Sequence, residues 1–247
     1  MSLTRRVRQY WLYSILVSRI YLSLCFPAFN EAPNIRGLIE DALRSGESFA
    51  QNFEIIIVND GSTDQTKAIV SDLQHQDPRI RLVNHSRNRG YGAAVWSGLR
   101  AARGKYLFYS DADRQFDLRE VKKLFAHIDH YDVIIGYRKT RQDHFMRRVN
   151  TWGWAKLAHL ALGIKAKDPD CAFKLFRRSA LAEISVRSQG AVFSPELLLR
   201  LKHLNRSIKE IPVTHLPRRS GSPTGASARV IIRALRELFD LWRRERS

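Results

Sequence analysis

Two carboxylates stand one residue apart near the middle of the chain, in the stretch YSDADRQFD that follows the apolar run KYLF. Asp111 and Asp113 would repel each other, so a cation or a cationic ligand is expected to offset their charge. Carboxylate oxygens suit Mg²⁺ or Mn²⁺, and Gln115 adds a neutral oxygen two positions on. Such an incomplete protein shell leaves places for substrate phosphate oxygens. The alternative is a helix N-terminus that carries acids, with Asp117 as its cap.

Two further polar clusters follow apolar runs nearer the start of the chain. PAFNEAPN comes after YLSLCF, and NDGSTD comes after FEIIIV. Asp60 could accept a hydrogen bond from a nucleobase N–H group, and Glu31 could do similar work. A structural role also fits, because Asp-Gly pairs favour turns and Asp64 could cap the helix that it precedes.

A glycine-rich stretch, NRGYGAA, follows the next apolar run. Gly90 and Gly92 lie at an expected helix start, where unpaired N–H groups and the positive end of the helix dipole favour phosphate. The stretch matches neither a dinucleotide-binding fingerprint nor a Walker loop. H-E-x-x-H and G-x-S-x-G motifs do not occur either, so zinc hydrolase and serine hydrolase functions have no support.

Short apolar runs alternate with amphipathic stretches and predict the elements that would position these clusters. We expect strands at residues 20–26, 53–58, 79–83, 105–110, 132–137 and 207–213. We expect helices at residues 33–45, 64–76, 92–103, 117–130, 146–162 and 195–203, and a loop at 167–173. Pro33 suits the first turn of a helix, and Gly104 suits a C-terminal cap.

The alternation predicts an α/β fold, with a doubly wound, mainly parallel sheet flanked by helices in a single domain. At 247 residues the chain can bury one sizeable core. We expect this domain at residues 20–225, in two halves at 20–140 and 141–225, between basic ends at 1–19 and 226–247. The three polar clusters then fall at the carboxyl ends of strands, where such sheets bind their ligands.

The formal net charge is +18, from 42 Lys and Arg against 24 Asp and Glu, and it favours anionic partners. Nucleic acid, anionic lipid and phosphorylated small molecules all fit this charge. The arginines are dispersed and no nucleic-acid-binding motif occurs, so we expect no nucleic acid partner. Cys25 and Cys171 are the only cysteines and form no C-x-x-C pair, which favours reduced thiols and a cytoplasmic location.

The two ends of the chain bear on membrane contact. No window supplies the roughly 20 apolar residues that a spanning helix needs, so we expect a peripheral protein at the cytoplasmic face of a membrane. In the C-terminal stretch, apolar residues recur at helical spacing with arginines on the other faces: Ile231, Leu235, Leu238, Phe239 and Trp242. This pattern suits either a helix packed on the core or an interfacial helix on anionic lipid.

Taken in order, seven stretches resemble the family 2 inverting glycosyltransferases over residues 20–225. They are FPAFNE, VNDGSTD, NRGYGAA, DADRQF, DPDCAFKLF, PELLLRL and IKEIPV with RRSGS after it. The most similar subgroup is the polyprenyl-phosphate, or dolichyl-phosphate, mannosyl- and glucosyltransferases. The order of the motifs carries the resemblance, since each stretch alone is common.

The resemblance implies a GT-A fold, a UDP- or GDP-linked sugar donor and a divalent cofactor, Mg²⁺ or Mn²⁺. The metal would bridge the donor diphosphate through Asp113 and Gln115, while Asp111 would touch the ribose or the sugar. Further residues are implied for the base, the ribose and the nucleotide pocket: Pro27, Phe29, Glu31, Asp60, Asn88 and Gly90.

The acceptor half is implied to supply phosphate-binding residues and further acids. Arginines and a serine would meet the phosphates of donor or acceptor: Arg138, Arg148, Arg219 and Ser222, with the choice within the pairs Arg147–Arg148 and Arg218–Arg219 left open. Asp170 and Glu196 stand where relatives keep acids near the sugar, so they join Asp111 and Asp113 as the expected catalytic residues. A polyprenyl phosphate acceptor is already anionic near neutral pH and demands no strong base. A saccharide hydroxyl, the alternative acceptor, would need Glu196 or Asp170 to take its proton.

Two positions depart from the family pattern. Asn59 replaces the first of two adjacent aspartates that are common in the second motif, and Ala172 stands where glycine is usual. Nucleotide recognition and the shape of the acceptor loop are therefore where this chain is expected to differ. A third hypothesis, of a different class, is a non-catalytic basic module that binds membrane or nucleic acid.

Overall fold

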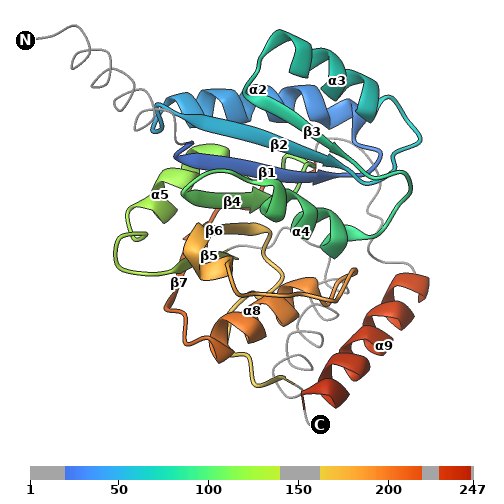
Figure 1. Ribbon diagram of the computed structural model, residues 1–247, viewed down its shortest axis with the longest axis vertical. Coiled ribbons are helices and arrows are strands. Elements are labelled where there is room, and N and C mark those ends of the chain that lie inside the picture. Colours follow the sequence, from blue (N-terminus) through green and yellow to red (C-terminus); the bar gives the residue numbers. More distant parts are fainter. Residues whose placement is uncertain (1–19, 140–161, 219–227, 246–247) are drawn as a thin grey trace, which may run out of the picture.

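The described residues build one sheet of seven strands, shown in Figure 1. The computed structural model describes residues 20–139, 162–218 and 228–245. In chain order the strands are β1 (Leu22–Ala28), β2 (Phe53–Asn59), β3 (Ile80–Asn84), β4 (Tyr106–Ser110), β5 (Val133–Arg138), β6 (Phe173–Arg177) and β7 (Ile208–Val213). Their order in space is β3-β2-β1-β4-β6-β5-β7.

The sheet is mainly parallel, which confirms the predicted α/β class. β1 pairs in parallel with β2 and β4, β2 with β3, and β5 with β7. β6 alone runs antiparallel, between β4 and β5. Part of β6 was predicted to be a loop, and that prediction was wrong. The strand has only five residues, and the charged Lys174 near its middle interrupts the apolar run by which a strand is recognised in a sequence.

Helices cover both faces of the sheet. In chain order they are α2 (Ala32–Glu47), α3 (Thr66–Gln76), α4 (Tyr91–Ala101), the 3-10 turn η1 (Leu118–Glu120), α5 (Val121–Phe125), α7 (Arg178–Leu181), α8 (Phe193–His203) and α9 (Ala228–Arg244). Figure 1 shows α2 and α3 on one face of β1, β2 and β3, and α4 on the other. Ile35, Leu38, Ile39 and Ala42 of α2 recur at helical spacing and are all buried.

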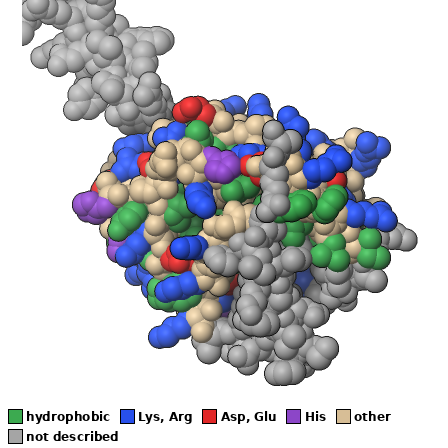
Figure 2. All heavy atoms as spheres, turned by 90° about the horizontal axis from the view of Figure 1, so that it is seen from below, with side chains coloured by type: hydrophobic (Ala, Val, Ile, Leu, Met, Phe, Trp, Pro, Cys, Tyr) green, Lys and Arg blue, Asp and Glu red, His purple; other side chains and the backbone are tan. Residues whose placement is uncertain are grey.

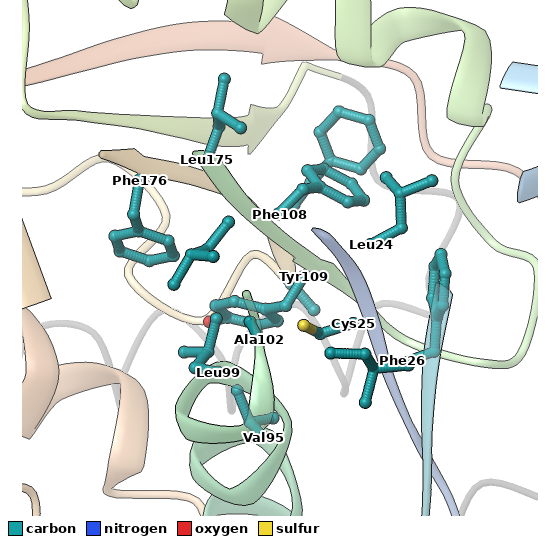
Figure 3. Close-up of a cluster of buried hydrophobic side chains, with 14 of the residues drawn as sticks. Leu24, Cys25, Phe26, Val95, Leu99, Ala102, Phe108, Tyr109, Leu175 and Phe176 are labelled. Atoms are coloured by element: carbon teal, nitrogen blue, oxygen red, sulfur yellow. The ribbon is translucent and has the colours of Figure 1, made fainter. Parts of the chain in front are cut away.

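One part of the core lies where β1, β4 and β6 meet α4. Figure 3 shows Cys25 and Tyr109 facing Val95 and Leu99 of α4, while Phe108 points toward the other face of the sheet. This alternation follows from the strand period of two. Every residue of β2 is buried, as expected of a central parallel strand covered on both faces. Because helices pack on both faces of these strands, the strands hold the starting points of the loops at their carboxyl ends in place.

Two predictions about helix ends were wrong. The helix expected at 117–130 is instead η1 followed by the short α5, because the chain beyond α5 closes i to i−3 hydrogen bonds such as Ile128 N to Phe125 O. Gly104 does not cap α4, which ends at Ala101. Its N–H donates to Ser23 Oγ at 2.9 Å, and an added Cβ would lie 2.7 Å from Ser23 N. Gly104 therefore permits a close backbone crossing.

Some expectations concern parts of the chain that the structure does not describe. They are the basic segment 1–19, most of the helix at 146–162, and the phosphate-binding roles of Arg148, Arg219 and Ser222. These expectations, and the division of the chain into halves, stay predictions.

Candidate active site

The loops after β1 and β2 are held together at the carboxyl end of the sheet. Glu31 N donates to Thr66 Oγ1 at 2.9 Å, and Ala32 N donates to Asp64 Oδ2 at 3.1 Å. Asp64 Oδ1 also accepts from Thr66 N at 2.9 Å, but the N-cap residue of α3 is Gln65 and not the predicted Asp64. These bonds fix the start of α2 against the start of α3. Glu31 is thereby held at the edge where ligands of such sheets bind.

Asp60 holds the loop after β3 against the end of β2. It is only 3% exposed, and its Oδ1 lies 2.6 Å from Nδ1 of His85. Arg89 N and Gly90 N donate to its two carboxylate oxygens, each at 2.9 Å. Both oxygens thus have protein partners before any nucleobase arrives. The role of Asp60 as a direct base contact stays a prediction, and the structure gives it a positioning role.

The other residues predicted to bind the nucleotide lie around this loop. Phe29 and Asn88 are exposed, and Pro27 is half-buried. Gly61 has a φ of +71°, and a Cβ there would lie 2.5 Å from Asn88 N. Since L side chains rarely adopt such a φ, glycine at 61 lets the loops after β2 and β3 approach closely.

Asn59, one of the departures from the family pattern, also serves this loop. Its side-chain amide donates to Asn84 Oδ1 at 2.6 Å, and its Oδ1 accepts from Ser62 N at 3.1 Å. An aspartate in the same place could accept from Ser62 but could not donate. The amide at 59 therefore links the ends of β2 and β3.

Asp111 and Asp113 follow β4 and lie close enough to influence each other. Burial and then the negative charge of Asp113 raise the pKa of Asp111 to about 7. Asp111 Oδ1 is buried and has no hydrogen-bond partner among the described residues. Interaction with the Tyr91 hydroxyl, at the start of α4, opposes this rise in the pKa of Asp111. Asp111 therefore carries an oxygen that a ligand or a cation is needed to satisfy.

Asp113 and Gln115 complete this turn. Asp113 Oδ1 accepts from Gln115 N at 3.2 Å, and Gln115 Nε2 donates to Leu216 O at 3.2 Å. The Gln115 side-chain oxygen carries lone pairs, so it can coordinate a cation. Between the two, Arg114 has a φ of +59° and its side chain donates to Asp41. Its positive charge is thus directed to α2.

A divalent cation fits this set of residues. It would offset the repulsion between Asp111 and Asp113 and would give the unpartnered oxygen of Asp111 a partner. Within residues 20–139, 162–218 and 228–245, no three His, Cys, Asp or Glu side chains gather to form a metal site. Substrate oxygens would therefore have to complete the coordination, as Mg²⁺ often requires.

Arg218 reaches the same place from the segment after β7. Its Nη2 lies 2.9 Å from Glu31 Oε1 and 3.8 Å from Asp113 Oδ2. Asn34 Nδ2 also donates to Glu31, at 2.6 Å. Burial raises the pKa of Glu31, while Asn34 and Arg218 oppose that rise. Sequence reasoning counted Arg218 among the candidate phosphate-binding arginines but could not choose between it and Arg219, because the partners of Arg218 lie far away in the chain.

Arg138, predicted to bind phosphate, is paired within the protein. Its Nε lies 2.7 Å from Asp168 Oδ2, and its Nη2 lies 2.9 Å from Asp168 Oδ1. Asp168 is buried, so this two-point contact holds the loop before β6 against the end of β5. Asp170, in the same loop, is half-buried and acts electrostatically on Tyr91 and Arg138. Asp170 therefore lies near Tyr91 and Arg138, and its role in the site stays a prediction.

Lys174 is a residue of this region that sequence reasoning missed. It lies in β6 with no exposed surface, and its Nζ donates to the carbonyls of Pro169, at 3.0 Å, and Cys171. A buried ammonium is costly unless it is hydrogen-bonded. Here those bonds fix the loop that carries Asp168 and Asp170. The signal available in the sequence was a lone lysine inside the apolar stretch FKLF.

Glu196 lies away from solvent in the first turn of α8. Its side chain is 0% exposed, and its Oε2 accepts from Ser188 N at 2.7 Å and Arg187 N at 3.2 Å. The next residue of that loop, Gln189, accepts from Gly92 N at 2.8 Å. Glu196 thus supports the start of α4 through the loop. Its other oxygen, Oε1, lies 3.4 Å from Arg200 Nη2, so both carboxylate oxygens have partners within the protein.

The fold is α/β, and the acidic residues lie at the carboxyl ends of parallel strands, where such folds bind their ligands. The chain belongs to glycosyl transferase family 2, whose model matches residues 23–185. It is 30% identical to the dodecaprenyl-phosphate galacturonate synthase of Rhizobium johnstonii, over 91% of this chain and 66% of that protein. It is also 30% identical to the dolichyl-phosphate beta-glucosyltransferase of Saccharomyces cerevisiae, over 79% of this chain and 66% of that protein. The chain thus spans about two thirds of the length of these curated relatives.

A solved structure confirms the GT-A fold. Glucosyl-3-phosphoglycerate synthase from Mycobacterium tuberculosis, crystallised with Mn²⁺, UDP and glucosyl-3-phosphoglycerate, has a TM-score of 0.63 with this chain. The two share 21% sequence identity, and the match covers 92% of this chain and 82% of that one. At this identity the likeness establishes the fold and leaves the substrates open.

Proposed function

We propose that this protein transfers a sugar from a nucleotide-sugar to a polyprenyl phosphate, with Mg²⁺ or Mn²⁺ as cofactor and inversion at the anomeric carbon. The observation that carries the proposal is the buried, unpartnered Oδ1 of Asp111 next to Asp113, at the carboxyl end of the sheet. Support for the acceptor comes from the two relatives, whose names specify dodecaprenyl phosphate and dolichyl phosphate.

The donor half of the site would bind the nucleotide-sugar through the loops after β1, β2 and β3. Phe29 and Asn88 offer exposed surface to the nucleotide, while Asp60 holds their loops in place. Asp113 and Gln115 would hold the metal, which stabilises the departing diphosphate when bound. Asp111, whose carboxylate interacts with Tyr91, would face the ribose or the sugar.

The acceptor would attack from the face of the sugar opposite to the nucleotide. A lipid phosphate is already anionic, so the attacking oxygen needs no base. Arg138, Arg148 and Arg219, with Ser222, are proposed to hold phosphates there. A saccharide hydroxyl fits less well, because Glu196 has no exposed surface and its carboxylate is bonded to the loop before α8.

The protein is proposed to work as a peripheral protein at the cytoplasmic face of an anionic membrane. Three apolar side chains of α9 are exposed: Ile232 at 51%, Leu235 at 46% and Phe239 at 58%. Leu238 and Leu241 on the same helix are buried, so α9 has more apolar surface than the body of the protein covers. Figure 2 shows hydrophobic side chains among Lys and Arg side chains on the side where α9 lies. Among the described helices, none is long and apolar enough to cross a bilayer.

Transfer to lipid can be tested directly. Purified protein with Mn²⁺ or Mg²⁺ is incubated with a polyprenyl phosphate and, in turn, UDP-glucose, UDP-galactose, UDP-N-acetylglucosamine and GDP-mannose. Mass spectrometry of the lipid extract should show a metal-dependent glycosyl-phosphoryl lipid with one donor. Nucleotide release without any lipid product across the panel would instead favour a saccharide acceptor.

A further inference from the structure

Arg218 occupies an unusual place, because a fixed positive charge lies between two acids of the proposed donor site. Its Nη2 is 2.9 Å from Glu31 Oε1 and 3.8 Å from Asp113 Oδ2. The three side chains are 24%, 15% and 12% exposed, so water screens them only in part. In this arrangement the guanidinium neutralises carboxylates that the proposed function assigns to the nucleotide and the metal.

The segment that precedes Arg218 pairs with the turn after β4, and this pairing positions Arg218 in the site. Leu216 N donates to Gln115 O at 2.7 Å, and Gln115 Nε2 donates back to Leu216 O at 3.2 Å. Phe116 and His215 form an isolated antiparallel bridge beside it. Arg218 follows two residues after Leu216, so this pairing places its side chain beside the turn.

A divalent ion on Asp113 would change the balance of forces on this guanidinium. Two like charges near one carboxylate repel each other, and the repulsion is strong where water is partly excluded. A diphosphate that arrives with the ion offers oxygens that a guanidinium binds with two parallel hydrogen bonds. Without a nucleotide, Arg218 would compete with the divalent ion for Asp113. Once a nucleotide is bound, Arg218 and the ion would both bind its diphosphate and would stabilise each other's binding.

We propose that Arg218 is an exchangeable counter-ion of the donor site. Without ligands it neutralises Glu31 and Asp113, and when the metal and nucleotide bind it transfers its contact to the donor diphosphate. This inference rests on the proposed function for the identity of the ligands. It predicts that one substitution affects binding of the ion alone and binding of the nucleotide in opposite directions.

The test uses the full chain and measures binding rather than turnover. Calorimetry or electron paramagnetic resonance measures Mn²⁺ affinity without nucleotide, and calorimetry measures UDP affinity with Mn²⁺ saturating. Arg218→Gln should bind Mn²⁺ alone more tightly, by about threefold or more, the size of one partly exposed ion pair. The same variant should bind UDP more weakly by at least a similar factor. Arg218→Lys keeps the charge and should stay near the wild type for Mn²⁺ alone.

Arg206→Gln is the matched control, because Arg206 is 25% exposed and pairs with Glu183 elsewhere on the surface. It removes the same charge and should change neither affinity. Equal Mn²⁺ affinities for the wild type and Arg218→Gln, or an equal change in Arg206→Gln, would overturn the proposal for Arg218 alone. A wild-type protein that binds Mn²⁺ neither alone nor with UDP would overturn the proposed function as well.

Discussion

Asp113 connects the turn after β4 with the segment after β7, through Gln115 N on one oxygen and Arg218 near the other. Asp113→Asn keeps the size of the side chain and removes its charge. We expect transfer to fall by about a hundredfold or more, the usual effect of losing one group that stabilises developing charge. Mn²⁺ binding should weaken in parallel, as calorimetry can measure.

The control for that variant is Asp117→Asn, because Asp117 caps η1 by accepting from Arg119 N. An asparagine can accept the same bond, so folding and transfer should stay close to those of the wild type. Transfer by Asp113→Asn at the wild-type rate would contradict the assignment of Asp113 as a metal ligand.

Lys174 is expected to matter for both stability and activity. Lys174→Met fills the same space and leaves the carbonyls of Pro169 and Cys171 without their buried donor. The free energy of unfolding should fall by about 1–3 kcal/mol, the cost of unsatisfied buried polar groups. Urea unfolding measures this effect, and transfer should fall further than stability alone explains, since the loop carries Asp170. Lys122→Met, at an exposed position of α5, should change neither the free energy of unfolding nor the rate of transfer.

At the scale of single residues, sequence reasoning located the acids but not their partners. Asp111 and Asp113 could be predicted because they directly follow an apolar run, and a parallel sheet brings such residues together. The partner of Glu31, Arg218, lies 187 positions away, and the partner of Arg138, Asp168, lies 30 positions away. No local pattern marks such pairs, since only the strand order brings them together.

Among the elements, the crossing of the chain at Gly104 can be probed by adding one methyl group. In Gly104→Ala the Cβ would lie 2.7 Å from Ser23 N and 2.9 Å from Leu22 C, which are backbone atoms of β1. We expect the free energy of unfolding to fall by about 1–3 kcal/mol, as for other overpacked sites. Thermal and urea unfolding would report it.

Gly98→Ala is the contrasting variant within α4. There the nearest atoms are the side-chain atoms Val58 Cγ2 at 3.1 Å and Cys25 Cβ at 3.4 Å, so only the valine methyl has to give way, by a few tenths of an ångström. Alanine also favours a helix over glycine by about 1 kcal/mol. If Gly98→Ala lost as much stability as Gly104→Ala, the close backbone contact at Gly104 could not be the cause of the loss in Gly104→Ala.

The exposed apolar residues of α9 give the membrane proposal its own test. Phe239→Ser removes a ring that is 58% exposed and contacts Trp242 at 5.8 Å between ring centroids. Cosedimentation with vesicles that contain anionic lipid should fall severalfold, because less apolar surface enters the interface. UDP and Mn²⁺ affinities should not change. Phe239→Leu should keep most of the vesicle binding, and equal binding by all three proteins would argue against α9 as the contact.

At the scale of elements, the alternation of apolar runs and helices predicted all the parallel strands and missed β6. A buried parallel strand needs an apolar run bounded by turns, which FEIIIV supplies. β6 is recognised only from its neighbours, because Lys174 finds its hydrogen bonds in the adjoining loop rather than in solvent. The C-terminal helix was predicted, whereas which of its apolar residues would be covered depends on the body that it packs against.

For the whole molecule, the acid limit of stability follows from carboxylates whose pKa lies below its ordinary range. The hydrogen bond from Arg79 lowers the pKa of Asp77, and the backbone N–H of Ser207 lowers that of Asp132. Because the pKa of each carboxylate is lower in the folded state, its charge contributes to stability at pH values above the ordinary aspartate pKa of about 4. This contribution is lost as the pH falls through the folded pKa.

Urea midpoints between about pH 5 and pH 3 should therefore decrease as the pH falls, within the range where these carboxylates take up protons. Arg79→Gln removes the main cause at Asp77 and should make the decrease smaller. A pH dependence in Arg79→Gln that is as steep as in the wild type would rule out this pair as a contributor.

The pairing of Gln115 with Leu216 joins residues 101 positions apart, and it bears on the order of events during synthesis. A ribosome adds about 5–20 residues per second. The acids after β4 therefore leave it some seconds before Leu216 and Arg218 are made. During that interval the nascent chain carries Glu31 and Asp113 without their guanidinium partner. The donor site can be completed only after Arg218 has been translated.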